Sequence, residues 1–130
     1  MGRILGIDYG HVRIGMAISD EEQQFAFEYE IWNPKDFFNK IKSLIETKEI
    51  KKIVLGLPLN MSGKNSEKTL EVLEFKEKLA SLIDIPIETI DERLSSKMAG
   101  NIAGTNKNID SLAAQLFLQN YLNKKNAQKS

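Results

Sequence analysis

Three acidic residues, Asp8, Glu92 and Asp110, each stand at the edge of an expected strand or helix, although they are far apart along the chain. Asp8 ends an apolar run and is followed by a turn, and Asp is seldom buried unless it is paired or binds a metal. Three carboxylates in one place repel one another, and Mg²⁺ or Mn²⁺, which prefer oxygen ligands, would relieve that repulsion. Such a site suits phosphodiester hydrolysis, in which two metals activate water and stabilise the leaving oxygen.

Each acid also has an ordinary structural explanation. Asp8 is of a residue type that is common in turns. Glu92 could form a surface ion pair with its neighbour Arg93, and Asp110 precedes an apolar helical pattern that it could cap. The spacing of the acids therefore leaves both interpretations open.

Basic side chains near the expected strand ends are candidates for contacts with a phosphate. They are His11, Lys64 and Arg93. His11 is a lone histidine in a turn, which favours a solvated or phosphate-contacting role over metal ligation. Lys64 lies in a glycine-containing loop that lacks the Gly-Lys-Ser/Thr ending of a P-loop, so we do not expect nucleotide binding of that kind.

The apolar pattern predicts an α/β fold with a mixed five-stranded sheet and helices on both faces. Runs at residues 3–8, 13–19 and 25–31, joined by short connections, predict antiparallel strands, and residues 53–57 and 85–90 predict two parallel ones. Right-handed crossovers would place the first, fourth and fifth strands side by side, with Asp8, Pro58 and Asp91 near their carboxyl ends. Ligands of open α/β sheets bind at those ends.

Helical spacing predicts four helices. One begins at Pro34, one spans residues 67–83 after a Ser66 cap, a short one spans residues 94–103, and the last spans residues 109–122. The expected inner face of the second helix is Val72, Phe75, Leu79 and Leu82, and the expected stripe of the last is Ile109, Leu112, Ala113, Leu116, Phe117 and Tyr121.

Length and composition indicate one domain, residues 1–130, with a polar tail from about residue 124 that we expect to fray. The 18 basic and 18 acidic side chains give zero net charge, a mild argument against tight nonspecific DNA binding. The chain has no cysteine, which excludes disulfides and thiolate-bound zinc. No apolar run approaches the roughly 18 residues of a membrane span, so we expect a cytoplasmic protein without a membrane partner.

Four blocks of the sequence resemble a known family. They are residues 6–10 (GIDYG) with 13–20 (RIGMAISD), residues 54–63 (VLGLPLNMSG), residues 91–95 (DERLS) and residues 109–114 (IDSLAA). In this order they are similar to the signature blocks of the bacterial pre-16S rRNA nuclease family, which has also been labelled as Holliday junction resolvases. The match covers nearly the whole chain, and the combination is specific although the first block alone is not.

The resemblance implies a ribonuclease-H-like fold and a cytoplasmic nuclease that uses Mg²⁺ or Mn²⁺ in maturation of the 5′ end of the small-subunit rRNA. By position, Asp8, Glu92 and Asp110 match the catalytic, metal-binding acids. The expected substrate-binding residues are Tyr9, Gly10, His11, Arg13, Asn60, Lys64 and Arg93. The expected partners are precursor rRNA or structured DNA, and the ribosome, with the protein a monomer or weak homodimer.

Two departures from the family pattern concern substrate contacts. Val12 stands where relatives usually carry a basic residue, and the segment between Leu94 and Ile109 is shorter than expected, with only two lysines. These differences predict a weaker grip on the substrate there, or help from a partner such as the ribosome. They leave the three acids unaffected.

Three other functions remain open at this point. A Holliday junction resolvase would use the same chemistry on branched DNA, but it needs two sites and hence a dimer, and neutral composition suits it less well. A noncatalytic module that docks on ribosomes or transcription complexes is a second alternative. The first block also resembles the phosphate-binding hairpin of sugar kinases and actin-like ATPases, which need two such domains, whereas 130 residues hold one.

Overall fold

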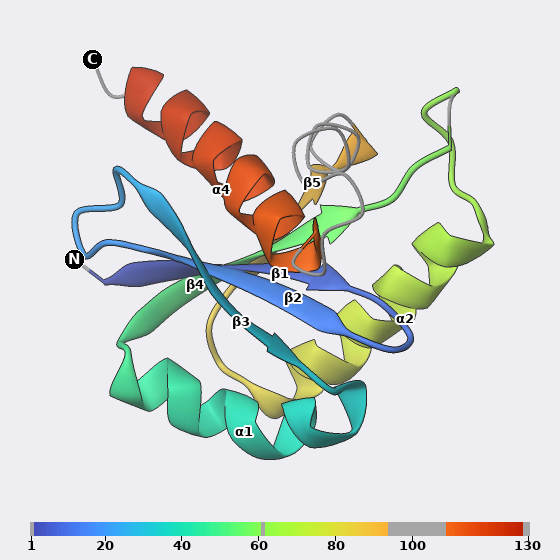
Figure 1. The fold of residues 1–130 in the computed structure, drawn as a ribbon, viewed down its shortest axis with the longest axis horizontal. Helices are drawn as coiled ribbons and strands as arrows, with labels where there is room; N and C mark the ends of the chain where they lie inside the picture. The colour runs from blue at the N-terminus through green and yellow to red at the C-terminus, as the bar shows by residue number, and fades with distance from the viewer. Residues whose placement is uncertain (1, 61, 94–108, 129–130) are drawn as a thin grey trace.

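The computed structural model describes residues 2–60, 62–93 and 109–128, with the backbone alone for residues 109 and 110. One five-stranded sheet lies between two layers of helices (Figure 1). The strands are β1 (Arg3–Tyr9), β2 (Ile14–Ser19), β3 (Ala26–Trp32), β4 (Ile50–Leu57) and β5 (Ile87–Asp91), and the helices are α1 (Pro34–Thr47), α2 (Glu67–Leu82) and α4 (Ile109–Ala127). The predicted α/β class and mixed sheet are confirmed.

The strand order is β3-β2-β1-β4-β5, with β1 antiparallel to β2 and parallel to β4, and β4 parallel to β5. The prediction that the first, fourth and fifth strands lie side by side is therefore confirmed. Asp8 is the last but one residue of β1, Pro58 follows β4, and Asp91 ends β5. All three lie at the carboxyl ends of parallel strands, where ligands of such sheets bind.

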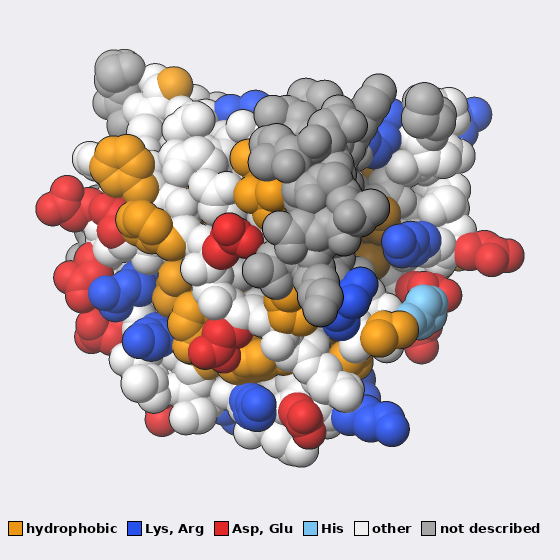
Figure 2. All heavy atoms as spheres, in the orientation of Figure 1, with side chains coloured by type: hydrophobic (Ala, Val, Ile, Leu, Met, Phe, Trp, Pro, Cys, Tyr) orange, Lys and Arg blue, Asp and Glu red, His pale blue; other side chains and the backbone are white. Residues whose placement is uncertain are grey.

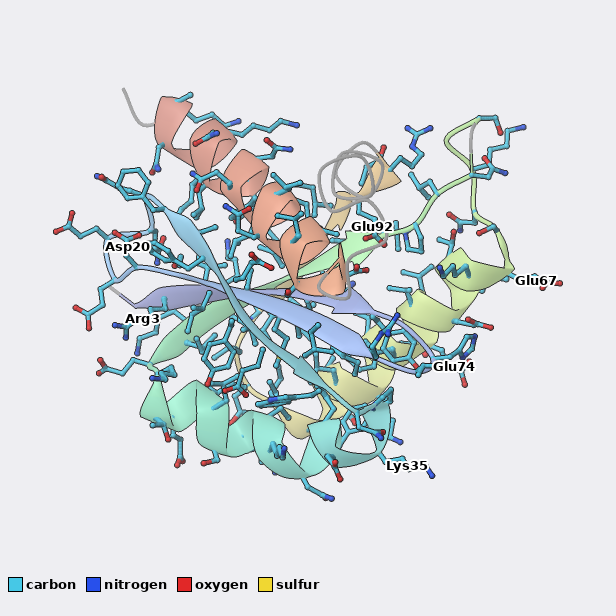
Figure 3. All side chains as sticks on the ribbon, viewed as in Figure 1. Arg3, Asp20, Lys35, Glu67, Glu74 and Glu92 are labelled. Carbon is cyan, nitrogen blue, oxygen red and sulfur yellow. The ribbon has the colours of Figure 1, made fainter. Side chains whose placement is uncertain are left out.

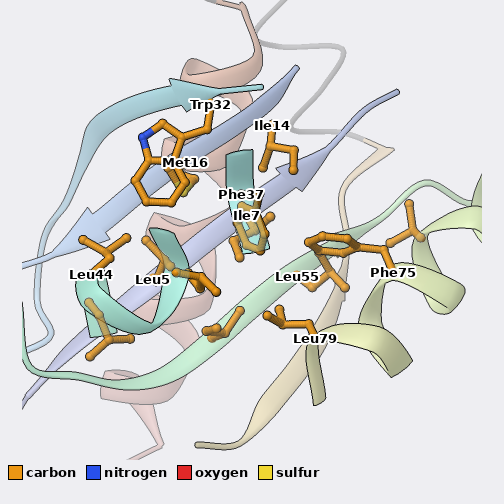
Figure 4. Packing of buried hydrophobic residues seen from close by; sticks show 14 residues of the cluster. Leu5, Ile7, Ile14, Met16, Trp32, Phe37, Leu44, Leu55, Phe75 and Leu79 are labelled. Carbon is orange, nitrogen blue, oxygen red and sulfur yellow. The ribbon is translucent and has the colours of Figure 1, made fainter. Parts of the chain in front are cut away.

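Helices α1 and α2 cover one face of the sheet over the larger part of the core. Leu5, Ile7 and Leu55 from the sheet belong to the same buried cluster as Phe75 and Leu79 of α2 (Figure 4). These side chains are at most 5% exposed, so burial of apolar surface fixes α2 on this face.

The ends of α1 and α2 follow the sequence signals. The Asn33 side chain accepts a hydrogen bond from the Lys35 backbone N–H at 2.9 Å, just before Pro34 begins α1. Ser66 and Thr69 form a reciprocal capping box at the start of α2. The prediction for Leu82 is wrong: it is 36% exposed, because α2 ends there and the following Ile83 and Ile85 pack against the core instead.

Helix α4 covers the opposite face of the sheet. Of the predicted stripe, Phe117 and Ala113 are buried and Tyr121 packs at the edge of this contact, but three further buried side chains were not predicted. They are Ala114, Leu118 and Leu122, which pack with Ile4, Ala17, Ala26 and Val54. The stripe is displaced because small and apolar residues surround most of this helix, so its spacing alone does not define one face.

The end of α4 also differs from the prediction. The helix continues to Ala127, so the expected end at Leu122 is wrong. The Lys125 ammonium and the Asn126 amide donate hydrogen bonds to the side-chain and backbone oxygens of Gln23 in the β2–β3 turn. These tertiary contacts extend the helix through polar residues whose composition alone does not predict a helix.

The helix predicted at residues 94–103 lies outside the described residues. The fifth strand begins at Ile87, after Pro86, rather than at residue 85. No helix in the described ranges is long and apolar enough to cross a membrane.

Candidate active site

Asp8 lies on the face of the sheet that α4 covers. Side chains alternate between the two faces along a strand, and in β1 Ile4 packs in the α4 cluster whereas Leu5 and Ile7 pack in the α1–α2 cluster. Asp8 therefore shares the face of Ile4, at the carboxyl end of the strand, and it is partly buried.

Glu92 reaches the same face from β5. Ile90 packs in the α4 cluster, and Glu92 follows two residues later, directly after the strand. Its backbone N–H donates to the Leu57 carbonyl at 3.3 Å, and the residue is 4% exposed. In Figure 3 Glu92 lies beside the end of β4.

Gly56 leaves the room that the Glu92 carboxylate occupies. Gly56 is paired with Ile90 on one side, and Leu55 beside it is paired with Ile7 on the other. A Cβ on Gly56 would stand 2.7 Å from Phe117 Cε2 and 3.0 Å from Glu92 Oε2. The carboxylate thus lies over β4, one strand spacing of about 4.8 Å from the strand that carries Asp8.

Asp110 is placed by the backbone of α4. The Leu118 Cβ and the Ala114 carbonyl lie 3.1 and 3.4 Å from the Cβ position of Gly6, so this side of the helix crosses β1. Position 110 is one turn before Ala114 on the same side. Phe117 lies over the end of β4, and Tyr121 bonds to Lys52 near its beginning. The helix therefore begins at the carboxyl ends of the strands, where Asp8 lies.

The donor set fits a hard divalent cation. Among the described side chains, no group of three or more His, Cys, Asp or Glu could hold a metal ion, and the side chain of Asp110 lies outside that set. Mg²⁺ is typically held by one or two carboxylates together with substrate phosphate. Asp8 and the buried Glu92 would supply oxygen ligands of this kind, and the absence of a side chain at Gly56 leaves room for the Glu92 carboxylate.

Two of the predicted substrate contacts in the β1–β2 hairpin, Tyr9 and His11, contact α2 rather than the face that α4 covers. The Tyr9 ring stacks on Phe75 with centroids 4.3 Å apart, on the α2 side and away from the α4 face. A Cβ on Gly10 would stand 2.8 Å from the Arg13 carbonyl, so the turn requires glycine. His11 Nε2 lies 2.7 Å from Glu71 Oε2, and the side chains of His11 and Arg13 are exposed.

The loop between β4 and α2 (residues 58–66, here the β4–α2 loop) holds two more predicted contacts. Asn60 Oδ1 accepts hydrogen bonds from the Ser62 and Lys64 backbone N–H groups at 3.0 and 2.9 Å, so this side chain shapes the loop. Lys64 is exposed. The structure brings this loop to the end of β5, where Arg93 contacts it.

Two further residues at the site, Gly56 and Asp91, were not predicted from the sequence. Gly56 interrupts the apolar run at residues 53–57, and an interrupting glycine in a strand signals close approach of another group. Asp91 binds the Arg93 guanidinium, and this ion pair lowers the pKa of Asp91 and raises that of Arg93. The interpretation of Glu92 as the surface partner of Arg93 is wrong, because Asp91 takes that place and Glu92 is buried.

Comparison with known proteins gives the family. The sequence profile of the RuvX family, described as "Holliday junction resolvase", matches residues 2–124. The chain belongs to this family. A Maridesulfovibrio salexigens protein named "Putative pre-16S rRNA nuclease" is 38% identical over 92% of this chain and 97% of its own. A Sulfurihydrogenibium relative of the same name is 42% identical over 95% and 92%.

Solved structures show the fold of this RuvX family member. A complex of T. thermophilus RuvC with a Holliday junction substrate has a TM-score of 0.54 at 12% identity and covers 96% of both chains. A fowlpox virus resolvase with Holliday junction DNA has a TM-score of 0.53 at 12% identity, covering 95% of this chain and 98% of the other. The fold is ribonuclease-H-like, as expected. The protein is thus a hydrolase of a nuclease family, with nucleic acid as its class of substrate, and nucleases of this fold generally use divalent metals.

Proposed function

We propose that this protein is a divalent-metal-dependent endonuclease that matures the 5′ end of the small-subunit rRNA precursor. The proposal depends above all on one observation, the buried Glu92 carboxylate over Gly56 on the face that carries Asp8. The names of relatives with 38% and 42% identity support the RNA substrate.

The three acids would hold Mg²⁺ or Mn²⁺. When bound, the metal ions supply activation of the attacking water and stabilisation of the leaving oxygen. Burial between β4 and Phe117 restricts the Glu92 carboxylate to one place, so it offers its oxygens without a large loss of rotamer freedom. Asp8 is less buried than Glu92 and lies at the carboxyl end of β1, and position 110 lies in the first turn of α4.

Exposed basic side chains around this end would bind neighbouring phosphates. His11, Arg13 and Lys64 are exposed on the hairpin and the β4–α2 loop. Gly10 keeps the hairpin turn tight, and Tyr9 and Asn60 shape the backbone from which these side chains project. We place Arg93 at the border of the region where the substrate would bind.

We expect only a few local contacts to contribute to RNA binding. Figure 2 shows Lys and Arg side chains interspersed with Asp and Glu over the face in view, in keeping with the net charge of zero. Phosphate neutralisation dominates affinity for nucleic acids. We therefore expect weak binding of free RNA and a contribution from the ribosome, with the protein acting in the cytoplasm as a monomer or weak homodimer.

The test is cleavage of a 5′-extended small-subunit rRNA precursor and of a synthetic four-way DNA junction, each with Mg²⁺ or Mn²⁺. We expect cleavage of the RNA and loss of that cleavage in Asp8→Asn. Cleavage of the junction without the RNA would instead favour a resolvase, the activity named in the family description. If the protein binds RNA but cuts neither substrate, a noncatalytic ribosome-associated role replaces the proposal.

A further inference from the structure

The two residues that flank Glu92 are bonded to each other. Arg93 Nη2 donates to Asp91 Oδ2 at 2.7 Å, and Arg93 Nε lies 3.1 and 3.0 Å from the two carboxylate oxygens. The Arg93 backbone N–H also donates to Asp91 Oδ1 at 3.0 Å. Planar, charge-assisted contacts of this kind fix orientation as well as add energy.

The same guanidinium contacts the β4–α2 loop. Arg93 Nη1 donates to the Asn60 carbonyl at 3.2 Å, and its nitrogens lie 3.7 Å from the Cβ position of Gly63, which has a φ of +79°. The loop is closed by hydrogen bonds from the Asn60 N–H to the Lys64 carbonyl and from the Gly63 N–H to the Asn60 carbonyl, both 2.9 Å. Arg93 therefore fastens a compact turn to the end of β5.

The other end of the loop is fixed to both neighbouring elements. The Pro58 carbonyl accepts a hydrogen bond from the Thr69 hydroxyl at 2.6 Å, which ties the loop to the first turn of α2. Next to it, the Leu57 carbonyl accepts from the Glu92 N–H at 3.3 Å. The chain around Glu92 is thus bonded twice to residues 57–60: through its own N–H to the Leu57 carbonyl, and through the Arg93 side chain to the Asn60 carbonyl.

These contacts give Arg93 a role different from that of a phosphate ligand. We propose that Arg93, with Asp91, is a positioning residue that clamps the β4–α2 loop to the end of β5 and so fixes the Glu92 carboxylate over Gly56. The inference rests on the proposed function, since it takes Glu92 as a metal-binding acid. It deepens that function by separating the residues that grip RNA from those that set the geometry of the site.

A double-mutant cycle on RNA cleavage tests the proposal. Asp91→Ala and Arg93→Ala each remove the clamp, so we expect each to lower kcat roughly tenfold to a hundredfold, as a displaced catalytic group does, with KM unchanged. The double variant should be no worse than either single one, because both remove the same contact. A phosphate ligand would behave differently: Arg93→Ala would raise KM, while Asp91→Ala, which frees the guanidinium, would lower it. That result would overturn the proposal.

Amide hydrogen exchange provides a readout that does not depend on activity. In Asp91→Ala and Arg93→Ala we expect faster exchange in peptides covering residues 58–66 and 87–93, because the clamp no longer holds the loop. Arg3→Ala is the matched control: Arg3 pairs with Glu21 at 3.6 Å at the far end of the sheet from Glu92 (Figure 3), and its removal should leave both peptides unchanged.

The two measurements separate failure of the clamp from failure of the proposed function. If wild-type protein cuts no substrate, the proposed function falls and hydrogen exchange alone decides on the clamp. If wild-type protein cuts RNA but the loop exchanges at the same rate in the variants as in the wild type, the clamp is contradicted and the function stands.

Discussion

The Glu92 carboxylate lies directly over Gly56, with Oε2 3.0 Å from the point that a Cβ on residue 56 would occupy. The Phe117 ring of α4 contacts the same point, with Cε2 2.7 Å from it. One glycine thus sets both the packing of α4 on the sheet and the place of the Glu92 carboxylate. The fold and the chemistry of the site are coupled at this position.

The first prediction is that Gly56→Ala impairs both stability and cleavage. The added methyl forces the buried Phe117 ring and the Glu92 carboxylate to move, at a cost of about 1–3 kcal/mol in the free energy of unfolding. Urea denaturation measures the stability, and RNA cleavage is compared at a temperature where the variant is folded. Gly6→Ala is the control, because its methyl would meet Leu118 and Ala114 less closely, at 3.1 and 3.4 Å, and no carboxylate. Equal cleavage rates in both variants would contradict the role of Gly56.

The second prediction concerns the exposed cations. Lys64→Ala and Arg13→Ala should each weaken RNA binding and reduce the slope of log K against log salt by about 1, because each removes one phosphate contact. The rate of cleavage at saturating RNA should change little. Fluorescence anisotropy over a series of KCl concentrations measures the slope, and a slope identical to that of the wild type would show that the residue does not touch a phosphate.

The third prediction concerns the pH dependence of a partly exposed cluster formed by Lys52, Glu88 and Tyr121 of α4. The Tyr121 hydroxyl and the Lys52 ammonium, 3.1 Å from Glu88 Oε1, lower the pKa of Glu88 below its usual 4.5. Because the folded pKa is below the unfolded one, the stabilisation is present above pH 4.5 and is lost as the pH falls through the folded value. Glu88 is half exposed, so the effect of Glu88→Gln should be below about 1 kcal/mol at neutral pH.

Thermal unfolding of wild type and Glu88→Gln at neutral and strongly acidic pH checks this sign. The difference between the two proteins should shrink as the pH falls. A difference that grows in acid would show that the cluster is not an ionic contact in the folded protein.

The fourth prediction concerns the end of α4. A chain that stops after Leu122 should lose about 1–2 kcal/mol of stability, because the hydrogen bonds of Lys125 and Asn126 to Gln23 are removed. A chain that stops after Gln128 keeps both contacts and should unfold like the full chain. Urea denaturation compares the three proteins, and equal midpoints would mean that this end of the helix adds nothing.

Local signals in the sequence were sufficient for most of the fold. Asn33-Pro34 and Ser66 start α1 and α2 as expected, because caps act within a few residues. The C-terminal end of α4 was not predicted, because it depends on a distant contact. Asn126 in its last turn donates a hydrogen bond to Gln23, about a hundred residues earlier in the chain. A polar composition cannot reveal a partner of that kind.

The candidate site shows the same division. The strand order brings Asp8 and Glu92 to one end of the sheet, as the sequence predicts, and alternation along the strands puts them on one face. The roles of Gly56 and Asp91 depend on which atoms meet across strands, and the pattern of residue types does not contain that information. The Tyr9 ring, which was predicted to contact substrate, stacks on Phe75 on the face opposite that of Asp8, as alternation along β1 requires of neighbouring residues.

The most direct test of the account is the single-turnover rate of cleavage of a 5′-extended small-subunit rRNA precursor by wild type, Asp8→Asn and Glu92→Gln, with RNA binding measured in parallel. Both substitutions keep the size of the side chain and remove its charge. We predict rates at least about 100-fold lower in both variants, given that even residues which only support metal ligands cost 10–100-fold when changed, with RNA binding retained. Cleavage at the wild-type rate by either variant would contradict the assignment of these carboxylates as the catalytic pair.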